Sequence, residues 1–322
     1  MLTFILRRTL IMIPQLILLS LIIFLLAKAM PGDAVTSAFQ GNPDATPEQI
    51  EKIREKLGLN DPWYVQYGTW IGNAVQGDLG QSYTHKQPVT TLLAGRVANT
   101  LLLAIGTLIV TYIIAIPLGI IAGRWTDTWA DKIIVTYNYF AFATPLFVFA
   151  LLMLFLFSFI LGWFPIGGSV DIRAEAGTWE YIVSKVEHLV LPVMSGALLM
   201  TFGTIQYLRN DIIDTKLKDF VKTARAKGVP EGKVYTRHIL RNSLLPIAAF
   251  LGYEITGLIA GSIFIEMIFS YPGLGKLFIE SVLGRDFTVV TALVMISGAA
   301  AIVGTMLSDI ILSIVDPRIR ID

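Results

Sequence analysis

The sequence predicts an all-α polytopic membrane protein with six transmembrane helices. Hydrophobic residues make up 54% of its 322 residues and charged residues 15%, whereas soluble domains carry about 25% charged residues. Six stretches are apolar over about 20 residues, the length that crosses a hydrocarbon core of about 30 Å. We place them at residues 10–29, 100–122, 133–161, 189–208, 244–269 and 289–314. The third is long enough to be tilted or to project beyond the bilayer.

The distribution of Lys and Arg predicts the orientation. Basic residues gather before the first span, after the second, between the fourth and fifth, and after the sixth. Because positive residues are retained in the cytoplasm, we expect both termini to be cytoplasmic. Residues 1–29 also resemble a signal peptide, but their apolar run exceeds the usual length of about 7–15 residues and Lys28 interrupts the cleavage triplet. A retained first transmembrane helix is favoured.

The composition excludes several classes of function. Cysteine is absent, so disulfides, thiolate metal sites and a cysteine nucleophile are excluded. The net charge of +1 gives no basic field for nucleic acid. His85, His188 and His238 lie far apart and lack the spacing of zinc ligands. We therefore expect no metal site and no nucleic-acid partner.

The chain divides into four parts. Residues 1–29 hold an N-terminal cytoplasmic tip and the first transmembrane helix, and residues 30–98 form an extracytoplasmic helical segment. Residues 99–314 form a core of five helices that includes a cytoplasmic loop at 209–246, and residues 315–322 are a cytoplasmic tail.

The extracytoplasmic segment predicts two short helices. Thr46 and Pro47 begin the first, which Gly58 ends, and Pro62 begins the second. Their apolar faces, which include Trp70, are interpreted as surfaces that pack on each other or rest at the membrane interface. Their polar tops are interpreted as a platform for an external partner.

Residues 219–246 are the one long polar segment in the last two thirds of the chain. Residues 216–227 lack Gly and Pro, which predicts a helix, and Gly228 then acts as a C-cap. Pro230 suits the first turn of a second helix that runs to about Asn242. The two helices predict a protruding elbow, where the small side chains of Ala224 and Ala226 would let another protein approach closely.

Several residues inside the spans carry structural or pathway hypotheses. The small residues of two Gly-x-x-x-Gly patterns predict close helix packing; they are Gly119 with Gly123, and Gly257 with Gly261. Glu254 lies inside the fifth span, where a charge is costly, so we expect it to line the translocation pathway. The alternatives are a position near the cytoplasmic boundary or a protonated carboxyl. Gln206 is a second pathway candidate, and Arg209 beside it is expected to extend to the membrane surface.

The chain lacks the motifs of an enzyme. Its segment 273–276 resembles a phosphate loop, but Ser270 stands at the first glycine position and Leu277 where Ser or Thr is required. No catalytic residues are assigned, and the energy for any transport would come from a partner. An ion-coupled secondary transporter would show repeated halves and several buried charges, and a channel would show a filter motif; neither pattern is evident. A membrane scaffold would have no need of the elbow.

Motifs in a fixed order add a family resemblance. They are Gly77-Asp78-Leu79-Gly80-Gln81-Ser82, Ala224-Arg225-Ala226-Lys227-Gly228 with the later H-x-x-R-N-x-L-L-P, a GS-x-x-x-E that ends at Glu266, the PGLG of 272–275 and the DPR of 316–318. Together they resemble the B-type permease subunits of dipeptide, oligopeptide and nickel ABC importers. The EAA loop of that family opens with Glu-Ala-Ala, whereas Lys222, Thr223 and Ala224 stand here.

The resemblance implies a role for two groups of residues. The first is a loop that couples to an ATPase, formed by Lys222, Thr223, Ala224, Arg225, Ala226, Lys227, Gly228, Val229 and Pro230. The second is an outer gate or turn, formed by Glu266, Pro272, Gly273 and Gly275.

The resemblance also implies the partners and the place of action. It implies a heterodimer with a second homologous permease, two cytoplasmic ABC ATPases that bind ATP and Mg, and an extracytoplasmic substrate-binding protein. The location would be the plasma (inner) membrane of a bacterial cell, with the chain surrounded by the lipid bilayer. Peptides are the expected substrate, and nickel or another small solute is the alternative.

Overall fold

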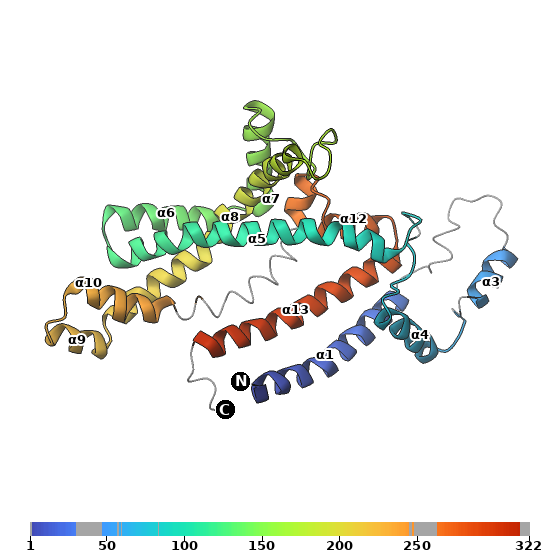
Figure 1. Ribbon diagram of the computed structural model, residues 1–322, viewed down its shortest axis with the longest axis horizontal. Helices are drawn as coiled ribbons and strands as arrows, with labels where there is room; N and C mark the ends of the chain where they lie inside the picture. Colours follow the sequence, from blue (N-terminus) through green and yellow to red (C-terminus); the bar gives the residue numbers. More distant parts are fainter. Residues whose placement is uncertain are drawn as a thin grey trace. The chain divides into compact units, whose positions relative to one another are not determined.

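The structure is a computed structural model that describes residues 2–29, 47–56, 58, 60–82, 84–244, 247 and 263–315. The regular elements within these ranges are helices, with one isolated β-bridge between Gln81 and Pro88 (Figure 1). In chain order they are α1 (Leu2–Ala29), α3 (Pro47–Lys56), α4 (Trp63–Val75), α5 (Val89–Arg124), α6 (Trp129–Ala143), α7 (Leu146–Met153), the π-helical η1 (Leu154–Ile160), α8 (Trp179–Lys216), α9 (Asp219–Ala226), α10 (Glu231–Lys233), the π-helical η2 (Val234–Leu240), α12 (Leu274–Leu283) and α13 (Phe287–Val315).

The chain forms two compact units. One contains residues 101–271 and the end of α13, and the other contains residues 2–100 and 272–303. The long helix α5 therefore contributes its first residues to one unit and the rest to the other.

Four helices in the described ranges are long and apolar enough to cross a membrane. They are Thr9–Ala29, Val89–Arg124, Trp179–Lys216 and Phe287–Met306. These helices contain most of the first, second, fourth and sixth spans that the sequence predicts. Most of the predicted fifth span, 244–269, lies outside the described residues.

The third predicted span is not one straight helix. Helix α6 ends at Ala143 and α7 begins at Leu146, and the two directions differ by 103°. Pro145 explains the break, because a proline disfavours helical backbone at the residue before it. Thr144 accordingly has φ −86° and ψ 121°. The third predicted span is therefore interrupted at residues 144–145, a break that the sequence analysis did not predict.

Helices α3 and α4 begin where the sequence predicts. Helix α3 begins at Pro47, α4 follows Pro62, and Gly58 between them has a positive φ of 66°. The apolar face of α4 packs on α1, since the Tyr67 ring lies 5.5 Å from that of Phe24. This face of α4 therefore packs on α1, a partner that the sequence did not predict.

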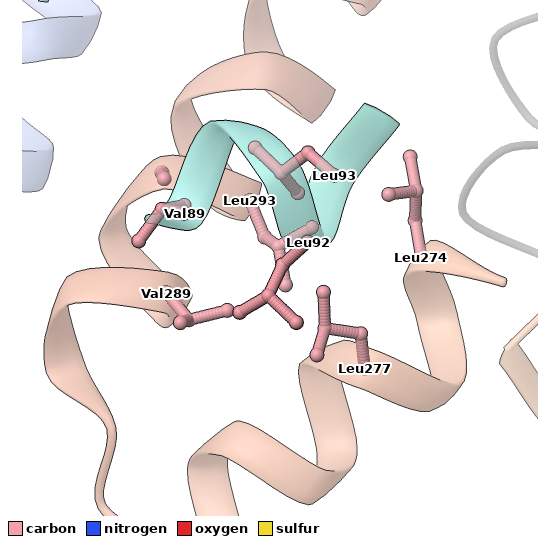
Figure 2. Close-up of a cluster of buried hydrophobic side chains, with 8 residues drawn as sticks. Val89, Leu92, Leu93, Leu274, Leu277, Val289 and Leu293 are labelled. Carbon is pink, nitrogen blue, oxygen red and sulfur yellow. The ribbon is translucent and has the colours of Figure 1, made fainter. Parts of the chain in front are cut away.

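A compact apolar cluster holds the second unit together. The start of α5 contributes three of its side chains, and α12 and α13 contribute the others (Figure 2). The buried members are Val89, Leu92, Leu93, Leu274, Leu277, Val289, Ala292 and Leu293. Helix α12 is thereby fixed against the beginning of α5.

Helices α5 and α8 pack closely in the first unit. A Cβ atom added to Gly119 would lie 3.0 Å from Cβ of Leu208, and one added to Gly123 would lie 2.8 Å from Cβ of Ile212. Atoms at these distances would overlap, so only glycine allows this approach. The close packing predicted for Gly119 and Gly123 is confirmed.

Candidate functional site

The candidate site is an elbow formed by residues 217–244 at the end of α8 (Figure 1). Helix α8 ends at Lys216, and Lys218 has an extended backbone with φ −67° and ψ 148° before α9 begins. The continuous helix predicted over 216–227 is therefore wrong in its first turn. The break lets α9 leave the direction of α8 and fold back onto it.

Gly228 makes the turn of the elbow. Its φ is +73°, its N–H donates to Arg225 O at 2.9 Å, and the N–H of Val229 donates to Ala224 O at 3.2 Å. These two bonds form a Schellman motif, which satisfies the carbonyl groups that a helix leaves free at its end. The predicted role of Gly228 as a C-cap is confirmed.

The second arm of the elbow starts after Pro230. Pro230 O accepts hydrogen bonds from the N–H groups of Lys233 and Val234 at 2.8 and 3.0 Å. The chain stays helical through α10, η2 and residues 241–244, close to the predicted length. Arg225 also pairs with Glu231 across the turn at 2.7 Å, although both side chains are exposed and such pairs stabilise little.

The inner face of the elbow packs against helix α8. Val221 and Ala224 of α9 and three side chains of the second arm contact the same apolar cluster as Leu208 and Ile212. The second-arm members are Val234, Tyr235 and Ile239. Ala224 therefore faces the chain's own core, and the expectation that it lets another protein approach is wrong. Ala226 is exposed, as that expectation requires.

The outer face of the elbow is basic. Its exposed cationic side chains come from both arms and from the residues that follow η2. They are Lys218, Lys222, Arg225, Lys227, Lys233, Arg237 and Arg241. Thr223, Gly228 and Pro230 are also exposed, while Val229 is partly covered. The elbow thus combines an apolar interior with a polar, positively charged surface.

Tyr235 is part of the apolar interior of the elbow and lies near the charged side chain of Arg124. Burial raises the pKa of its phenol above the usual range, and the positive charge of Arg124 partly opposes that rise. The phenol therefore stays neutral at physiological pH. Its role is packing and hydrogen bonding.

Of the two pathway candidates, Gln206 lies within the described residues and Glu254 does not. Gln206 is half-buried on α8; it accepts a hydrogen bond from the Asn138 amide at 3.1 Å and donates one to Asn210 at 3.3 Å. Glu254, Gly257 and Gly261 lie outside the described residues. The structure therefore does not bring Gln206 and Glu254 together.

The outer-turn candidates are held in the two units separately. Glu266 is fully buried in the first unit, and its carbonyl oxygen accepts a hydrogen bond from the N–H of Tyr271 at 2.8 Å. A carboxyl at 0% exposure is typical of a residue that organises its surroundings. The anchoring of the outer turn by Glu266 stays a prediction.

In the second unit the Pro-Gly-Leu-Gly segment is tied to α5. Pro272 O accepts from the Asn99 amide at 3.0 Å, and the N–H of Leu274 donates to the Thr100 hydroxyl at 2.8 Å. Gly273 precedes the first residue of α12, and Gly275 is buried in that helix. Sequence reasoning missed Asn99 and Thr100, because their partners lie more than 170 residues later along the chain.

An open groove of about 730 Å³ lies among residues 165–188. Asp171, Arg173, Glu187 and His188 are among the residues that line it. Arg173 holds the pKa of the Asp171 carboxyl at about 2, so this carboxylate stays charged at any physiological pH. The groove is therefore lined by both charged and apolar side chains.

Comparison with family models identifies the relationship. Residues 115–321 match the family described as "Binding-protein-dependent transport system inner membrane component". Residues 1–104 match "Binding-prot-dependent transport system membrane comp, N-term". The two matches cover nearly the whole chain and include the elbow.

Individual proteins agree with these matches. The chain is 40% identical over 321 residues to the oligopeptide transport system permease protein AppB of Bacillus subtilis, covering 99% of this chain and 100% of that one. It is 33% identical over 320 residues to the glutathione transport system permease protein GsiC of Escherichia coli O6:H1, covering 99% of each.

One solved structure shares the fold. The crystal structure of an amino acid ABC transporter with histidines matches with a TM-score of 0.51 and 18% identity, covering 71% of this chain and 94% of that one. The family matches and the apolar helices agree that this is a multi-pass membrane protein. The chain belongs to the family of binding-protein-dependent transport system inner membrane components, the permease subunits of ABC importers.

Proposed function

We propose that this chain is one permease subunit of an ATP-driven importer of peptides. It forms half of the translocation pathway and works with a second homologous permease, two cytoplasmic ATPases and an extracytoplasmic substrate-binding protein. ATP and Mg bind the ATPases. Peptides are proposed because curated relatives at 33–40% identity are named as oligopeptide, peptide or glutathione permeases. Nickel or another small solute is the second candidate.

We further propose that the elbow transmits the motion of an ATPase to the permease. The observation that carries this proposal is the contrast between the two faces of residues 217–244. The inner face is fastened to α8 by buried apolar side chains, and the outer face is basic and exposed. A coupling element needs both properties, because it must bind a partner and move the chain without deforming.

The docking proposal is tested by cross-linking single cysteines. The chain has no cysteine, so each variant carries one thiol. Ala226→Cys places it on the exposed outer face of the elbow, and Gly203→Cys places it on an exposed position of α8 within the predicted fourth span. We expect Ala226→Cys to cross-link to an ATPase subunit in membranes and Gly203→Cys not to do so. Equal yields from both positions would reject docking at the elbow.

The proposed orientation is tested with the same chemistry. Ile172 is 99% exposed in the loop that should face outward, and Ala226 should face the cytoplasm. In intact spheroplasts a membrane-impermeant maleimide should label Ile172→Cys but not Ala226→Cys, and lysis should make both reactive. Labelling of Ala226→Cys before lysis would reverse the orientation.

Transport measurements distinguish the energy source and the substrate. The complete complex is reconstituted in proteoliposomes with its binding protein, and uptake of a radiolabelled oligopeptide mixture is compared with uptake of nickel. We expect peptide uptake that requires ATP and persists after ion gradients are dissipated. Uptake that follows an ion gradient without ATP would favour a secondary transporter. ATP-dependent uptake of nickel alone would retain the importer and replace the substrate.

A further inference from the structure

The end of α5 is fastened to the end of α8. Lys216 is the last residue of α8, and its ammonium group donates hydrogen bonds to Gly123 O at 2.6 Å and to Arg124 O at 2.9 Å. Carbonyl groups in the last turn of a helix lack partners within the helix. Lys216 therefore caps α5 from another helix, directly before the elbow begins.

The second arm of the elbow also contacts the end of α5. The guanidinium carbon of Arg124 lies 4.7 Å from the ring centre of Tyr235 and 4.9 Å from that of Trp125. Tyr235 belongs to η2 and is buried, and its hydroxyl donates to Ile120 O at 3.4 Å. A cation between two aromatic rings is a specific attachment, because both rings must keep their position for it to persist.

The start of α6 is fastened to α8 by a buried ion pair. Arg209 donates to both carboxylate oxygens of Asp131, with N–O distances of 2.7 and 2.8 Å. Asp131 also accepts from the N–H of Asp127 at 2.8 Å, and its carboxylate is buried. Removing one partner would leave a buried charge without compensation. The sequence did not predict this partner for Arg209.

These contacts converge on one short turn, residues 124–128, which joins α5 to α6. We name Lys216, Arg124, Tyr235, Arg209 and Asp131 the clasp. Figure 1 shows the elbow beside the end at which α5 turns into α6. The turn is held by the end of α8, by the elbow's second arm and by a residue two helical turns earlier in α8.

We propose that the clasp makes the α5–α6 turn a second arm of the coupling device. Movement of the elbow reaches α6 through the clasp, and α6 carries it to the break at Pro145, beyond which α7 runs in a different direction. In this proposal the clasp residues are positioning residues, which act through the elbow and α6. This inference rests on the proposed function of the elbow and adds a route from the elbow to the third span.

The test removes the lysine that joins α8 to α5. Lys216→Met keeps an unbranched side chain, one atom shorter than lysine, and removes its charge and donors. Lys216→Arg restores a cationic donor. Lys185→Met is the control, because Lys185 lies on the same helix outside the elbow, with its ammonium group 5.4 Å from the Tyr181 ring centre. The readout is the number of radiolabelled peptide molecules imported for each ATP hydrolysed by the complete complex in proteoliposomes.

We expect Lys216→Met to hydrolyse ATP but to lower import for each ATP by about tenfold, which corresponds to about 1.4 kcal/mol at 25 °C. Lys185→Met should match the unmodified complex, and Lys216→Arg should recover most of the loss. A further readout follows α6 itself. Phe142 is exposed on α6, so Phe142→Cys can be labelled with a maleimide. The rate of this labelling should change when ATP is added to the complex that carries Phe142→Cys alone. It should not change when the same chain also carries Lys216→Met.

Two comparisons keep the inference separate from folding and from the proposed function. If Lys216→Met fails to insert, the test uses Tyr235→Leu and Tyr235→Phe instead. Tyr235→Leu removes the ring that lies against Arg124, whereas Tyr235→Phe keeps it. Only Tyr235→Leu should lower the number of peptides imported for each ATP. Cross-linking of Ala226→Cys reports elbow docking in every variant. Retained docking with unchanged import and unchanged labelling of α6 would overturn the clasp. If Ala226→Cys fails to cross-link to the ATPase in a chain without any clasp substitution, the proposed function of the elbow is overturned instead.

Discussion

The hydroxyl of Ser82 donates a hydrogen bond of 2.6 Å to the carboxylate of Asp286, which lies 204 residues later in the chain. Both side chains are almost fully buried, at 2% and 1% exposure. The carboxylate also accepts from the N–H of Thr84 at 3.1 Å, and the N–H of His85 donates to the Ser82 hydroxyl at 2.9 Å. The segment Gly77–Ser82 is therefore attached to the turn that precedes α13, which gives this motif a structural role.

Replacing Asp286 should destabilise the second unit. Asp286→Ala removes a charged acceptor and leaves the Ser82 hydroxyl and the Thr84 N–H without it, and hydrogen bonds to charged groups contribute about 1.5–3 kcal/mol each. Asp78→Ala is the control, because Asp78 is exposed and accepts one hydrogen bond, from the Gly80 N–H at 2.9 Å. Thermal denaturation followed by gel filtration in detergent should rank Asp286→Ala well below Asp78→Ala. Similar midpoints would contradict a structural role for the motif.

Alanine substitutions at Gly80 and Gly77 test two separate effects on stability, the strain of a left-handed backbone and a steric clash of the new Cβ. Their φ angles are +85° and +86°, so alanine at either position adopts a left-handed backbone at a cost of about 1–2 kcal/mol. A Cβ at Gly80 would also lie 2.9 Å from Cγ2 of Thr288, whereas a Cβ at Gly77 meets nothing within 4 Å. Gly80→Ala should therefore be the less stable variant in the same denaturation assay.

A second substitution tests the cause of that difference. Thr288→Ser removes the methyl group that the new Cβ would meet, so it should bring Gly80→Ala close to Gly77→Ala. If the double variant stays as unstable as Gly80→Ala alone, the contact with Thr288 is not the reason.

The contact between α5 and α8 gives a matched pair in the first unit. Gly123→Ala places Cβ 2.8 Å from Cβ of Ile212, while Gly203→Ala on α8 meets nothing within 4 Å. Overpacking in a well-packed interior costs about 1–3 kcal/mol, so Gly123→Ala should lower the denaturation midpoint. Gly203→Ala should leave it unchanged or raise it, because alanine favours helices over glycine. A stable Gly123→Ala would mean that the helices can separate without loss.

Local features of the fold were predictable from the sequence. The positions of Pro47, Gly58, Gly119, Gly123 and Gly228 agree with the structure, because glycine and proline act through their own backbone or through a close neighbour. Apolar length also located four of the spans. These predictions depend only on residues that lie near one another in the sequence, or on the hydropathy averaged over a stretch of about 20 residues.

Long-range and polar features were not predictable in this way. Hydropathy places the end of the fourth span near 208, but α8 continues to Lys216, because its polar end is stabilised by partners on other helices. Arg209 and Asp131 are 78 residues apart, and no local pattern links them. Pro145 was noted as part of a motif, yet the direction of the chain after it depends on the packing of α7.

Tyr271 should resist ionisation at alkaline pH. It lies after the predicted fifth span and is almost fully buried, and burial with the nearby negative charge of Glu266 raises the pKa of its phenol to about 12. An unfolded tyrosine ionises near pH 10, so the unfolded state releases this proton first. The contribution of Tyr271 to stability is therefore constant below about pH 10 and falls as the pH rises toward 12.

Absorbance at the tyrosinate band measures this directly. The spectrum of the unmodified protein minus that of Tyr271→Phe should show no tyrosinate signal up to about pH 11 while the protein remains folded. A signal that appears with a midpoint near pH 10 would show that the phenol is not held in the buried environment described here.

Gly228 provides the sharpest test of the elbow's geometry. Its φ is +73° and a Cβ there would meet nothing within 4 Å, so the cost of a substitution comes from the left-handed backbone and from what the new side chain presents outward. Gly228→Glu should insert and remain folded while peptide import is lost. Gly228→Asn should retain more import, because asparagine adopts this conformation more readily than other residues. Import is measured in proteoliposomes, and insertion by the yield of protein in the membrane.

Gly232 supplies the control for this series. It is exposed four residues later in α10, has open space around its Cβ position, and does not have a positive φ. Gly232→Glu adds the same charge to the elbow without straining the turn, so it should leave import largely intact. Equal loss from Gly228→Glu and Gly232→Glu would assign the effect to the added negative charge on a basic surface. Normal import by Gly228→Glu would contradict a coupling role for the turn, since the conformation that shapes the elbow would then be dispensable.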